Sequence, residues 1–482
     1  MLFVSWSFAV FLPIVFVLHY WGRRLVWQAG ILTVGSFVFY GWSNPRLIPL
    51  LAVACLVNSA ASVELLAAGR SLAHRRRTLI LALIFNVGTL AFFKYAALLG
   101  DLLLPELLWK RWGPWLSRIP LPVGISFFTF QGISLVVDAW YAGSKGIPGL
   151  PAPTTRAEIA QHYGKVTFFK AFFPQLIAGP IVKAGEFFHQ IGPKRLADLK
   201  WDQAIKALIL GFFLKMVVAD NLKEVTSAIR YPDFLDLPRV NLIALIYAFS
   251  FQLLADFAGY SIIAIGLGRL FGYELPINFN FPYLSRSITE FWRRWHMTLS
   301  SWLREYLYIP LGGSRRGEFI TYRNLFLVMF LGGLWHGAAW SYAVWGTAHG
   351  ILLAGERFFL RQHKAGVDEQ WSVWAVLRVL VIFSVITLLW LLFQLKEFRH
   401  AVEYLRCIGT HGGAPQFQAL YVIGVFSLPV VLWHIWEALS RWRRRTWSSR
   451  AQYQASTTAH AVMLFLIVTN SGPPGEFIYF QF

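Results

Sequence analysis

Charged side chains are scarce in this 482-residue sequence. Asp, Glu, Lys and Arg make up only 14% of it, whereas a soluble globular protein carries about 25%. Hydrophobic residues make up 56%, and 22 Trp and 42 Phe raise the aromatic share to 17%. A soluble fold has too little interior to bury that much apolar surface. The composition therefore excludes a soluble globular protein and indicates a polytopic membrane protein.

Cysteine is also scarce. Cys55 and Cys407 are the two cysteines in the sequence, and two distant thiols provide neither a disulfide framework nor a thiolate metal site. The sequence lacks a His-Glu-x-x-His motif, a phosphate-binding Gly-x-x-x-x-Gly-Lys loop and a Gly-x-Ser-x-Gly elbow. We therefore expect no metal and no ATP hydrolysis.

Acidic residues are outnumbered, because 44 Lys and Arg against 24 Asp and Glu give a net charge of +20. The basic residues form short clusters between apolar runs, for example Arg75–Arg77 and Arg441–Arg445. Such clusters are typical of cytoplasmic membrane loops rather than of a nucleic-acid-binding face. We therefore expect no nucleic-acid partner.

The first apolar run, Leu2–Tyr20, lacks the basic leader and the cleavage site of a signal peptide. We therefore expect it to remain as a membrane helix.

Apolar runs near membrane-spanning length recur throughout the chain. They predict an all-α protein with about ten to twelve transmembrane helices, forming a single membrane domain over residues 1–482. The expected spans are 2–20, 25–43, 47–66, 78–98, 121–141, 203–220, 241–271, 324–347, 373–394, 417–438 and 459–470. The basic clusters place the loops that hold Arg23, Arg75–Arg77 and Arg441–Arg445 in the cytoplasm, so the N-terminus is expected outside.

Two segments differ from ordinary loops and spans. Residues 168–180 are apolar but contain Pro174, Gly179 and Pro180. This composition predicts either a re-entrant segment or a kinked spanning helix.

Residues 287–308, written as a helix, place apolar side chains on one face and polar side chains on the opposite face. This pattern predicts one amphipathic helix along the membrane interface, which begins with a Ser287–Glu290 capping box. His296 lies at the inward edge of the apolar arc.

His336 is the main chemical candidate. It lies near the middle of the apolar stretch Leu325–Trp345, where an ionisable side chain indicates either a function or a neutral imidazole that bonds a neighbouring helix. His349 follows 13 residues later. On a straight helix this spacing places it about 20 Å along the axis and about 140° around it from His336, so the two histidines would not share a site and we expect a packing role for His349.

Asp256 is another buried charge expected from the sequence. It is expected to pair with an arginine of the interfacial helix, or else to relay protons.

Six aromatic- and glycine-rich segments occur in a specific order along the chain. They are Leu121–Phe130, Phe173–Pro180, Ala255–Tyr260, Phe291–His296, Trp335–Ala338 and Trp345–Gly350. Together they resemble the membrane-bound O-acyltransferase family, in its bacterial polysaccharide branch typified by alginate O-acetylases. The likeness extends over essentially the whole chain. One departure is Gln394, where relatives often carry an arginine.

The resemblance implies tilted helices and re-entrant or interfacial helices around a central funnel, with His336 as the catalytic residue and His296 as a second active-site residue. It implies an inner-membrane O-acetyltransferase for an exopolysaccharide such as alginate or cellulose. Acetyl-CoA would be the donor on the cytoplasmic side, with no bound cofactor, and a periplasmic acetyltransferase and the exopolysaccharide machinery would be the partners. A D-alanyl transferase for teichoic acid and, in another class, a proton-coupled transporter or flippase remain alternatives.

The basic clusters generate a prediction about topology. Single cysteines introduced beside Arg75–Arg77 or Arg441–Arg445 should resist a membrane-impermeant thiol reagent in intact cells, because clustered Lys and Arg resist translocation. They should react once the membrane is permeabilised. Labelling of either position in intact cells would contradict the proposed orientation.

Overall fold

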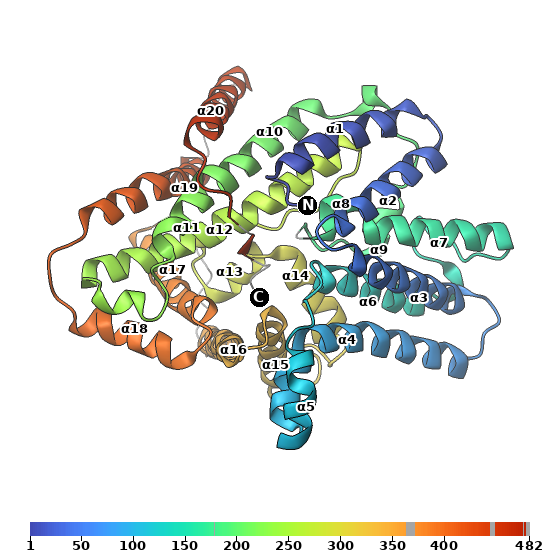
Figure 1. Cartoon of the computed structure of the whole chain (residues 1–482), viewed down its shortest axis with the longest axis horizontal. Coiled ribbons are helices and arrows are strands. Elements are labelled where there is room, and N and C mark those ends of the chain that lie inside the picture. Colours follow the sequence, from blue (N-terminus) through green and yellow to red (C-terminus); the bar gives the residue numbers. More distant parts are fainter. Residues whose placement is uncertain (178, 363–371, 444–448, 476, 479–482) are drawn as a thin grey trace. The chain divides into compact units, whose positions relative to one another are not determined.

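The computed structural model describes residues 1–177, 179–362, 372–443, 449–475 and 477–478 (Figure 1). Within these ranges the chain is built of helices and contains no β-strand, which confirms the predicted all-α fold class. The chain divides into two compact units, unit 1 with residues Met1–Ala207 and Ile263–Pro276, and unit 2 with residues Leu208–Ile262 and Ile277–Phe482. The expectation of a single domain over 1–482 stays a prediction.

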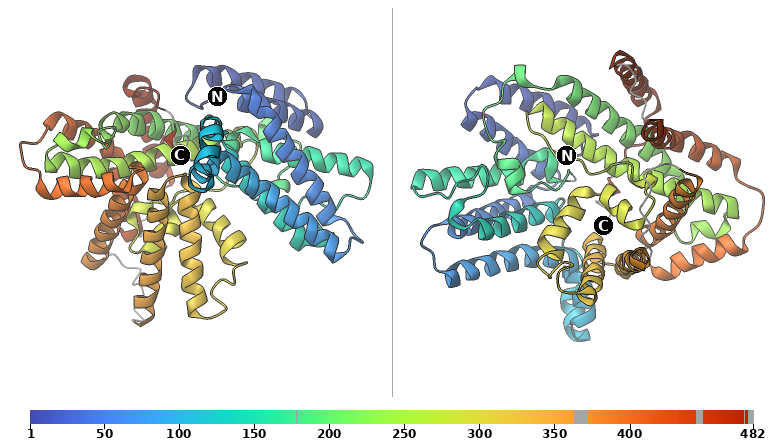
Figure 2. Two further views of the ribbon diagram at one scale, coloured as in Figure 1. Left: turned by 60° about the horizontal axis from the view of Figure 1, so that its bottom comes forward. Right: turned by 180° about the vertical axis from the view of Figure 1, so that it is seen from behind.

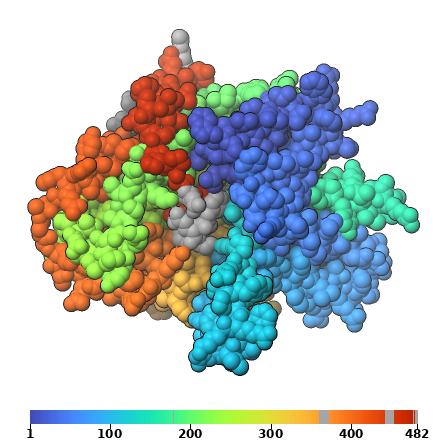
Figure 3. All heavy atoms as spheres, in the orientation of Figure 1, coloured from blue at the N-terminus to red at the C-terminus, as the bar shows by residue number. Residues whose placement is uncertain are grey.

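Unit 1 contains the N-terminal helices. They are α1 (Trp6–Trp21), α2 (Leu25–Gly41), α3 (Ile48–Leu66), α4 (Leu72–Leu103), α5 (Glu106–Leu116), α6 (Ile125–Ala142), α7 (Arg156–Ala171), α8 (Phe173–Leu176) and α9 (Ala184–Phe188). Helices α10 (Trp201–Phe212) and α12 (Arg239–Leu270) contribute residues to both units. Figure 3 shows the short α5 in cyan on the molecular surface. Its Leu107, Trp112 and Trp115 are exposed, a composition that suits a membrane interface.

Amides hold α3 and α4 together inside unit 1. Asn58 and Asn86 are buried and donate to each other's side-chain oxygens at 3.2 and 2.9 Å. Gly132 of α6 lies against this pair, since a Cβ there would overlap both amide oxygens and Lys170 Nζ. Interhelical amide bonds of this kind contribute about 1 kcal/mol in a membrane.

The apolar segment 168–180 is irregular, as expected from its prolines. Helix α7 ends at Ala171, α8 is a single turn, and the described residues from Phe168 to Pro180 are buried. A kinked helix running through the segment is therefore excluded. The free backbone groups find local partners, for example Phe173 N–H, which donates to the Ser36 hydroxyl at 3.0 Å.

Unit 2 contains the remaining helices. They are a π-helical segment (Phe213–Ala219), α11 (Asp220–Thr226), α13 (Ile288–Arg294), α14 (Met297–Leu303), a second π-helical segment (Arg304–Tyr308), α15 (Glu318–His336), α16 (Trp340–Gln362), α17 (Val373–Gln394), α18 (Phe398–Thr410), α19 (Phe417–Arg443) and α20 (Ser449–Asn470).

Five helical stretches in the described ranges are long and apolar enough to cross a membrane. They are Pro45–Leu66, Leu72–Leu103, Arg239–Leu270, Val373–Gln394 and Phe417–Ser440. The shorter α1 and α2 are also apolar. Each of these helices overlaps a predicted span, which supports the assignment of a membrane protein.

The predicted span 324–347 is wrong, because two helices occupy it. Helix α15 ends at His336 and α16 begins at Trp340, and the two pack closely as a hairpin (Figure 2). His336 is therefore the last residue of a helix rather than the middle of one. Hydropathy misses the turn because Gly337, Ala338 and Ala339 are themselves small and apolar.

Glycines allow the two helices of the hairpin to approach. A Cβ at Gly333 would overlap the Tyr342 carbonyl oxygen, and a Cβ at Gly346 would overlap the Met329 carbonyl oxygen. Gly350, four residues after Gly346, lies on the same face, with the Phe326 Cα 3.2 Å from its Cβ position. Small residues spaced by four commonly bring membrane helices together.

The predicted continuous helix 287–308 is also wrong. Trp295 is extended and His296 is left-handed, with φ 41° and ψ 54°, so α13 and α14 are separate helices. The cause is Asn278, whose carbonyl accepts from Met297 N–H at 2.9 Å and whose side chain accepts from the Thr298 hydroxyl at 2.6 Å. The predicted apolar arc nevertheless faces inward, because Phe291, Trp295, Leu299 and Trp302 are buried.

The glycine contact generates a prediction about stability. Gly346→Ala should destabilise the protein by about 1–3 kcal/mol, because the added methyl group overpacks a backbone contact. Gly355→Ala is the matched control on the same helix, since nothing lies within 4 Å of its Cβ position. That variant should be neutral or more stable, because alanine favours a helix over glycine. Thermal unfolding of the detergent-solubilised variants measures both effects, and equal melting temperatures would contradict the proposed contact.

Candidate active site

His336 ends α15 inside a cluster of aromatic rings. Its side chain is buried, and its ring centroid lies 4.8 Å from that of Trp335, 5.2 Å from Trp345 and 5.0 Å from Phe393. These rings come from α15, α16 and α17, so three helices converge on the imidazole. An ionisable group in such an apolar enclosure is expensive to bury and indicates a functional site.

A cavity of about 680 Å³ leads to His336. Along α15 it is lined by one helix face, formed by Leu325, Val328, Met329, Gly332 and His336. These positions extend about 16 Å along the helix axis. Helices α13 and α14 supply the other wall, including Trp292, Arg293 and Ser300.

A second, basic pocket adjoins the first at the beginning of α15. It measures about 400 Å³ and is lined by the loop that carries Arg315 and Arg316. Arg304 and Tyr308 line both pockets. A ligand with an anionic head and a long arm would therefore find cations at one end of this combined cavity and His336 at the other.

His296 is held in an unusual backbone conformation. A positive φ is uncommon for a residue with a side chain, and such strain is found preferentially at functional sites. Its ring is buried, 4.7 Å from Phe257 and 6.3 Å from Trp335. Trp335 therefore contacts both His296 and His336. Among the described residues that line the 680 Å³ cavity, His336 occurs and His296 does not.

The hairpin changes the expectation for His349. Because the chain folds back after His336, Trp345 contacts both histidines, with ring centroids 5.2 Å from His336 and 4.6 Å from His349. The assumption of a straight helix between them was therefore wrong. The His349 ring accepts a hydrogen bond from Trp292 Nε1 at 3.3 Å, so it fixes a tryptophan of the cavity wall.

Glu356 secures the same wall from α16. Its carboxylate accepts from the backbone N–H of Ile288 at 2.6 Å and of Thr289 at 3.3 Å. These are orphan donors of the first turn of α13, and a carboxylate there also suits the helix dipole. The Ser287 hydroxyl accepts from Glu290 N–H as predicted, while the Glu290 carboxylate accepts from Arg286 N–H. Three acceptors thus fix the beginning of α13.

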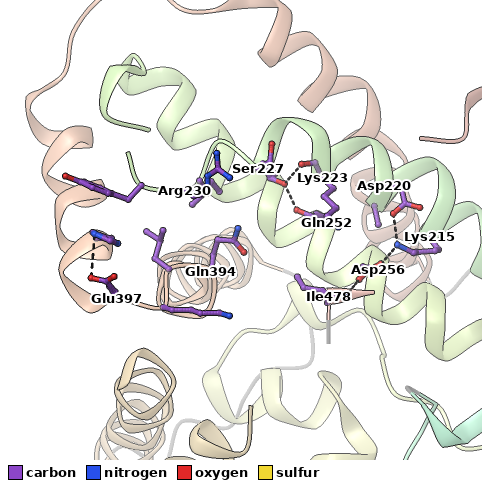
Figure 4. Close-up of a pocket in the computed structure, with 17 residues that line it drawn as sticks. Lys215, Asp220, Lys223, Ser227, Arg230, Gln252, Asp256, Gln394, Glu397 and Ile478 are labelled. Atoms are coloured by element: carbon purple, nitrogen blue, oxygen red, sulfur yellow. Dashed lines mark hydrogen bonds and ion pairs between the residues drawn. The ribbon is translucent and has the colours of Figure 1, made fainter. Parts of the chain in front are cut away.

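A third pocket of unit 2, about 470 Å³, lies beyond the end of α17 (Figure 4). Most of its lining residues have polar side chains, and they come from α11, α12, α17, α18, the first π-helical segment and the stretches that follow α11 and α17. Gln394 and Gln252 are among the side chains that line it. It shares no lining residue with the cavity at His336. Sequence reasoning missed this pocket, because its residues are distant from one another in the chain.

A buried charge cluster forms the floor of this pocket. Lys215 Nζ lies 2.5 Å from Asp220 and 2.9 Å from Asp256. The expected arginine partner of Asp256 was therefore wrong. Lys215 also donates to the Gly475 carbonyl at 3.1 Å, and Asp256 accepts from Ile478 N–H at 2.7 Å. The cluster thus anchors the segment after α20. An ionisable residue within the apolar run 208–219 was the sequence signal that could have revealed it.

Two pairs of consecutive residues connect the surroundings of the histidines with the far pocket. Phe393 contacts His336, and the next residue, Gln394, lines the far pocket. On α12, Phe257 contacts His296, and the preceding Asp256 lines the far pocket. Since α15 begins beside the basic pocket and ends beside Phe393, the basic pocket and the Gln394 pocket lie toward opposite ends of α15.

Comparison with known proteins identifies the family. Residues 117–395 match the model of the membrane-bound O-acyltransferase family. The chain belongs to this family. The match includes both histidines and the whole lining of the cavity at His336. The chain is therefore an O-acyltransferase, and the predicted resemblance is confirmed.

Several named relatives belong to the same group. A peptidoglycan O-acetyltransferase of Helicobacter pylori is 36% identical over 83% of this chain and 78% of the relative. A probable alginate O-acetylase of Pseudomonas putida is 40% identical over 72% of this chain and 69% of the relative. A teichoic acid D-alanyltransferase of Bacillus subtilis is 30% identical over 54% of this chain and 67% of the relative.

The Trp292–His349 bond generates a prediction about packing. His349→Phe should lower the free energy of unfolding by about 1 kcal/mol, because it leaves a partly buried indole N–H without its acceptor. His349→Gln retains an acceptor and should recover part of the loss. Chemical denaturation of the purified variants measures this difference, and equal destabilisation by Phe and Gln would show that the hydrogen bond contributes nothing.

Proposed function

We propose that this O-acyltransferase moves acetyl groups from acetyl-CoA on the cytoplasmic side of the inner membrane toward a polysaccharide on the other side. The observation that carries the proposal is the position of His336. It lines the cavity that adjoins the basic pocket, and its ring contacts Phe393, which directly precedes Gln394 of the other pocket. The donor would thus approach His336 through one cavity and the acceptor through another that shares no lining residue with it.

The basic pocket suits the donor. Arg304, Arg315 and Arg316 line it, and guanidinium groups bind phosphates through paired hydrogen bonds. The phosphates of coenzyme A would rest there, and the acyl arm would follow the α15 face to His336. Basic loops also favour the cytoplasmic side of a membrane, where acetyl-CoA is made.

His336 would act as the general base. It takes the proton of the acceptor hydroxyl while the hydroxyl oxygen attacks the thioester carbonyl carbon. The new carbon–oxygen bond forms, the carbon–sulfur bond breaks, and the proton passes from the imidazole to the departing thiolate. The products are an acetyl ester and free coenzyme A, so the step needs no bound cofactor or metal.

His296 would support this step from beside Trp335. Its strained backbone is fixed by Asn278, which is itself bonded through Nδ2 to the Ser261 hydroxyl of α12 at 2.8 Å. A ring so constrained suits the orientation or polarisation of reacting groups. Trp335 and Phe393 would keep water from the thioester until an acceptor arrives.

The relatives support acetyl as the group and a polysaccharide as the destination. The two acetylating relatives are 36% and 40% identical over 83% and 72% of this chain, whereas the D-alanyltransferase is 30% identical over 54%. We further propose that a periplasmic acetyltransferase and the exopolysaccharide machinery act with this protein in the bacterial inner membrane.

The proposed chemistry predicts the effect of removing the base. His336→Ala should lower acetyl transfer from acetyl-CoA by about 10²–10⁴-fold or more, while the protein remains in the membrane at normal abundance. Release of free coenzyme A thiol by the purified enzyme in the presence of acceptor measures this loss.

His162→Gln is a suitable control. His162 is a buried histidine of unit 1 whose Nε2 lies 2.7 Å from the Ser62 hydroxyl, and it lines none of the three pockets described in unit 2. That variant should retain transfer. Full activity in a normally inserted His336→Ala protein would reduce His336 to a packing residue and would refute the proposed mechanism.

A further inference from the structure

We infer that the Gln394 pocket, the 470 Å³ cavity beyond the end of α17, binds an uncharged, hydroxyl-rich segment of a glycan. This inference rests on the proposed function, because it assigns the acceptor to this pocket and names its chemical class. It commits to a neutral sugar chain rather than to a uronic acid chain or a peptide.

The charges of the pocket are largely compensated within the chain. Lys215 is shared by Asp220 and Asp256. Arg230 pairs with Asp233 at 2.9 Å, and Glu397 pairs with Arg399 at 2.7 Å. Lys223 and Lys396 also interact with other residues. A uronic acid chain would bring one carboxylate per sugar, and a carboxylate held at the floor of the pocket would compete with Asp220 and Asp256 for the buried Lys215.

The uncommitted polar groups of the pocket are uncharged. The Gln252 Oε1 accepts a hydrogen bond from the Thr226 hydroxyl at 2.5 Å. The amide N–H groups of Gln252 donate no hydrogen bond within the described residues. The Gln394 side chain likewise makes none within those residues. Each amide offers donors that a sugar hydroxyl accepts, and Gln394 offers an acceptor as well. Figure 4 shows these two side chains on different helices that border the same pocket.

An aromatic surface completes the pocket. The Tyr231 ring stacks on the His400 ring with centroids 4.2 Å apart and planes 2° from parallel. Tyr231 remains 45% exposed, so the stack holds the ring rigid without burying it. A fixed aromatic face beside a few directed polar groups is the usual composition of a small-molecule site, and the C–H face of a pyranose ring packs well against it.

The pocket also lies where an acceptor is needed. Gln394 directly follows Phe393, the ring that contacts His336. In the proposed reaction, a hydroxyl held beside Gln394 would pass Phe393 to reach the acyl group at His336. Because no residue lines both cavities, the donor and acceptor would bind independently, which allows the acceptor site to be tested without turnover.

The test is a binding measurement on the detergent-solubilised full chain, with cellohexaose as the neutral probe and hexamannuronate as the charged probe. Calorimetric titration should show that cellohexaose binds at least tenfold more tightly than hexamannuronate. Gln394→Ala and Gln252→Ala should each weaken cellohexaose binding about fivefold, as expected for the loss of one hydrogen bond. Gln418→Ala, an exposed glutamine of α19 outside the pocket, should leave binding unchanged.

Two further variants make the result specific. Gln394→Lys adds an uncompensated cation and should shift the preference toward hexamannuronate. His336→Ala should leave cellohexaose binding intact, so loss of transfer and loss of acceptor binding can be distinguished. Because Gln394 is only partly buried at a helix end, its variants keep the test valid if Gln252→Ala fails to fold.

Other outcomes would overturn the inference. Tighter binding of hexamannuronate would assign the pocket to an acidic glycan. Cellohexaose binding that the Gln252 and Gln394 variants leave unchanged would locate the sugar elsewhere. Absence of cellohexaose binding, with His336-dependent transfer retained, would refute the neutral-glycan site while leaving the proposed function in place.

Discussion

The close approach of α15 and α16 is the constraint on which the rest of the site depends. Gly333 and Gly346 let backbone meet backbone, so the chain reverses directly after His336 and brings Trp345 against it. The same reversal places His349 behind Trp292 and Glu356 at the first turn of α13. One hairpin thereby positions both the candidate base and the wall of its cavity, and a side chain at either glycine would displace all of them.

Aromatic rings surround the two histidines and distinguish a donor side from an acceptor side in the proposed mechanism. Trp335, Phe393 and Phe257 contact the imidazoles, and Phe393 and Gln394 are consecutive residues of α17. In the proposed mechanism these rings keep the thioester apart from water until the acceptor arrives. The left-handed backbone at His296 is the local strain that accompanies this arrangement, and Asn278 and Ser261 of the same unit stabilise it.

The sequence predicts those features that depend on composition and local pattern. Long apolar runs located the spanning helices, and the irregularity of 168–180 followed from its prolines. The break at His296 was not predictable, because it depends on Asn278, which lies outside the segment 287–308 and meets it only in the folded chain. The hairpin turn was hidden because Gly337 and Ala338 are as apolar as a helix interior. Lys215 and Asp256 meet only through tertiary structure. The catalytic roles of His336 and His296 stay predictions.

The most direct test of the account is the sidedness of transfer, since its central claim is that donor and acceptor approach His336 from opposite ends of α15. Purified protein is reconstituted in liposomes, the exposed face is identified by cleavage of a protease site inserted after Arg316, and radiolabelled acetyl-CoA and a glycan acceptor are supplied on chosen sides. The account predicts transfer when the donor meets the Arg315–Arg316 face and the acceptor meets the Gln394 face. Equal transfer with donor and acceptor together on either single face would contradict it.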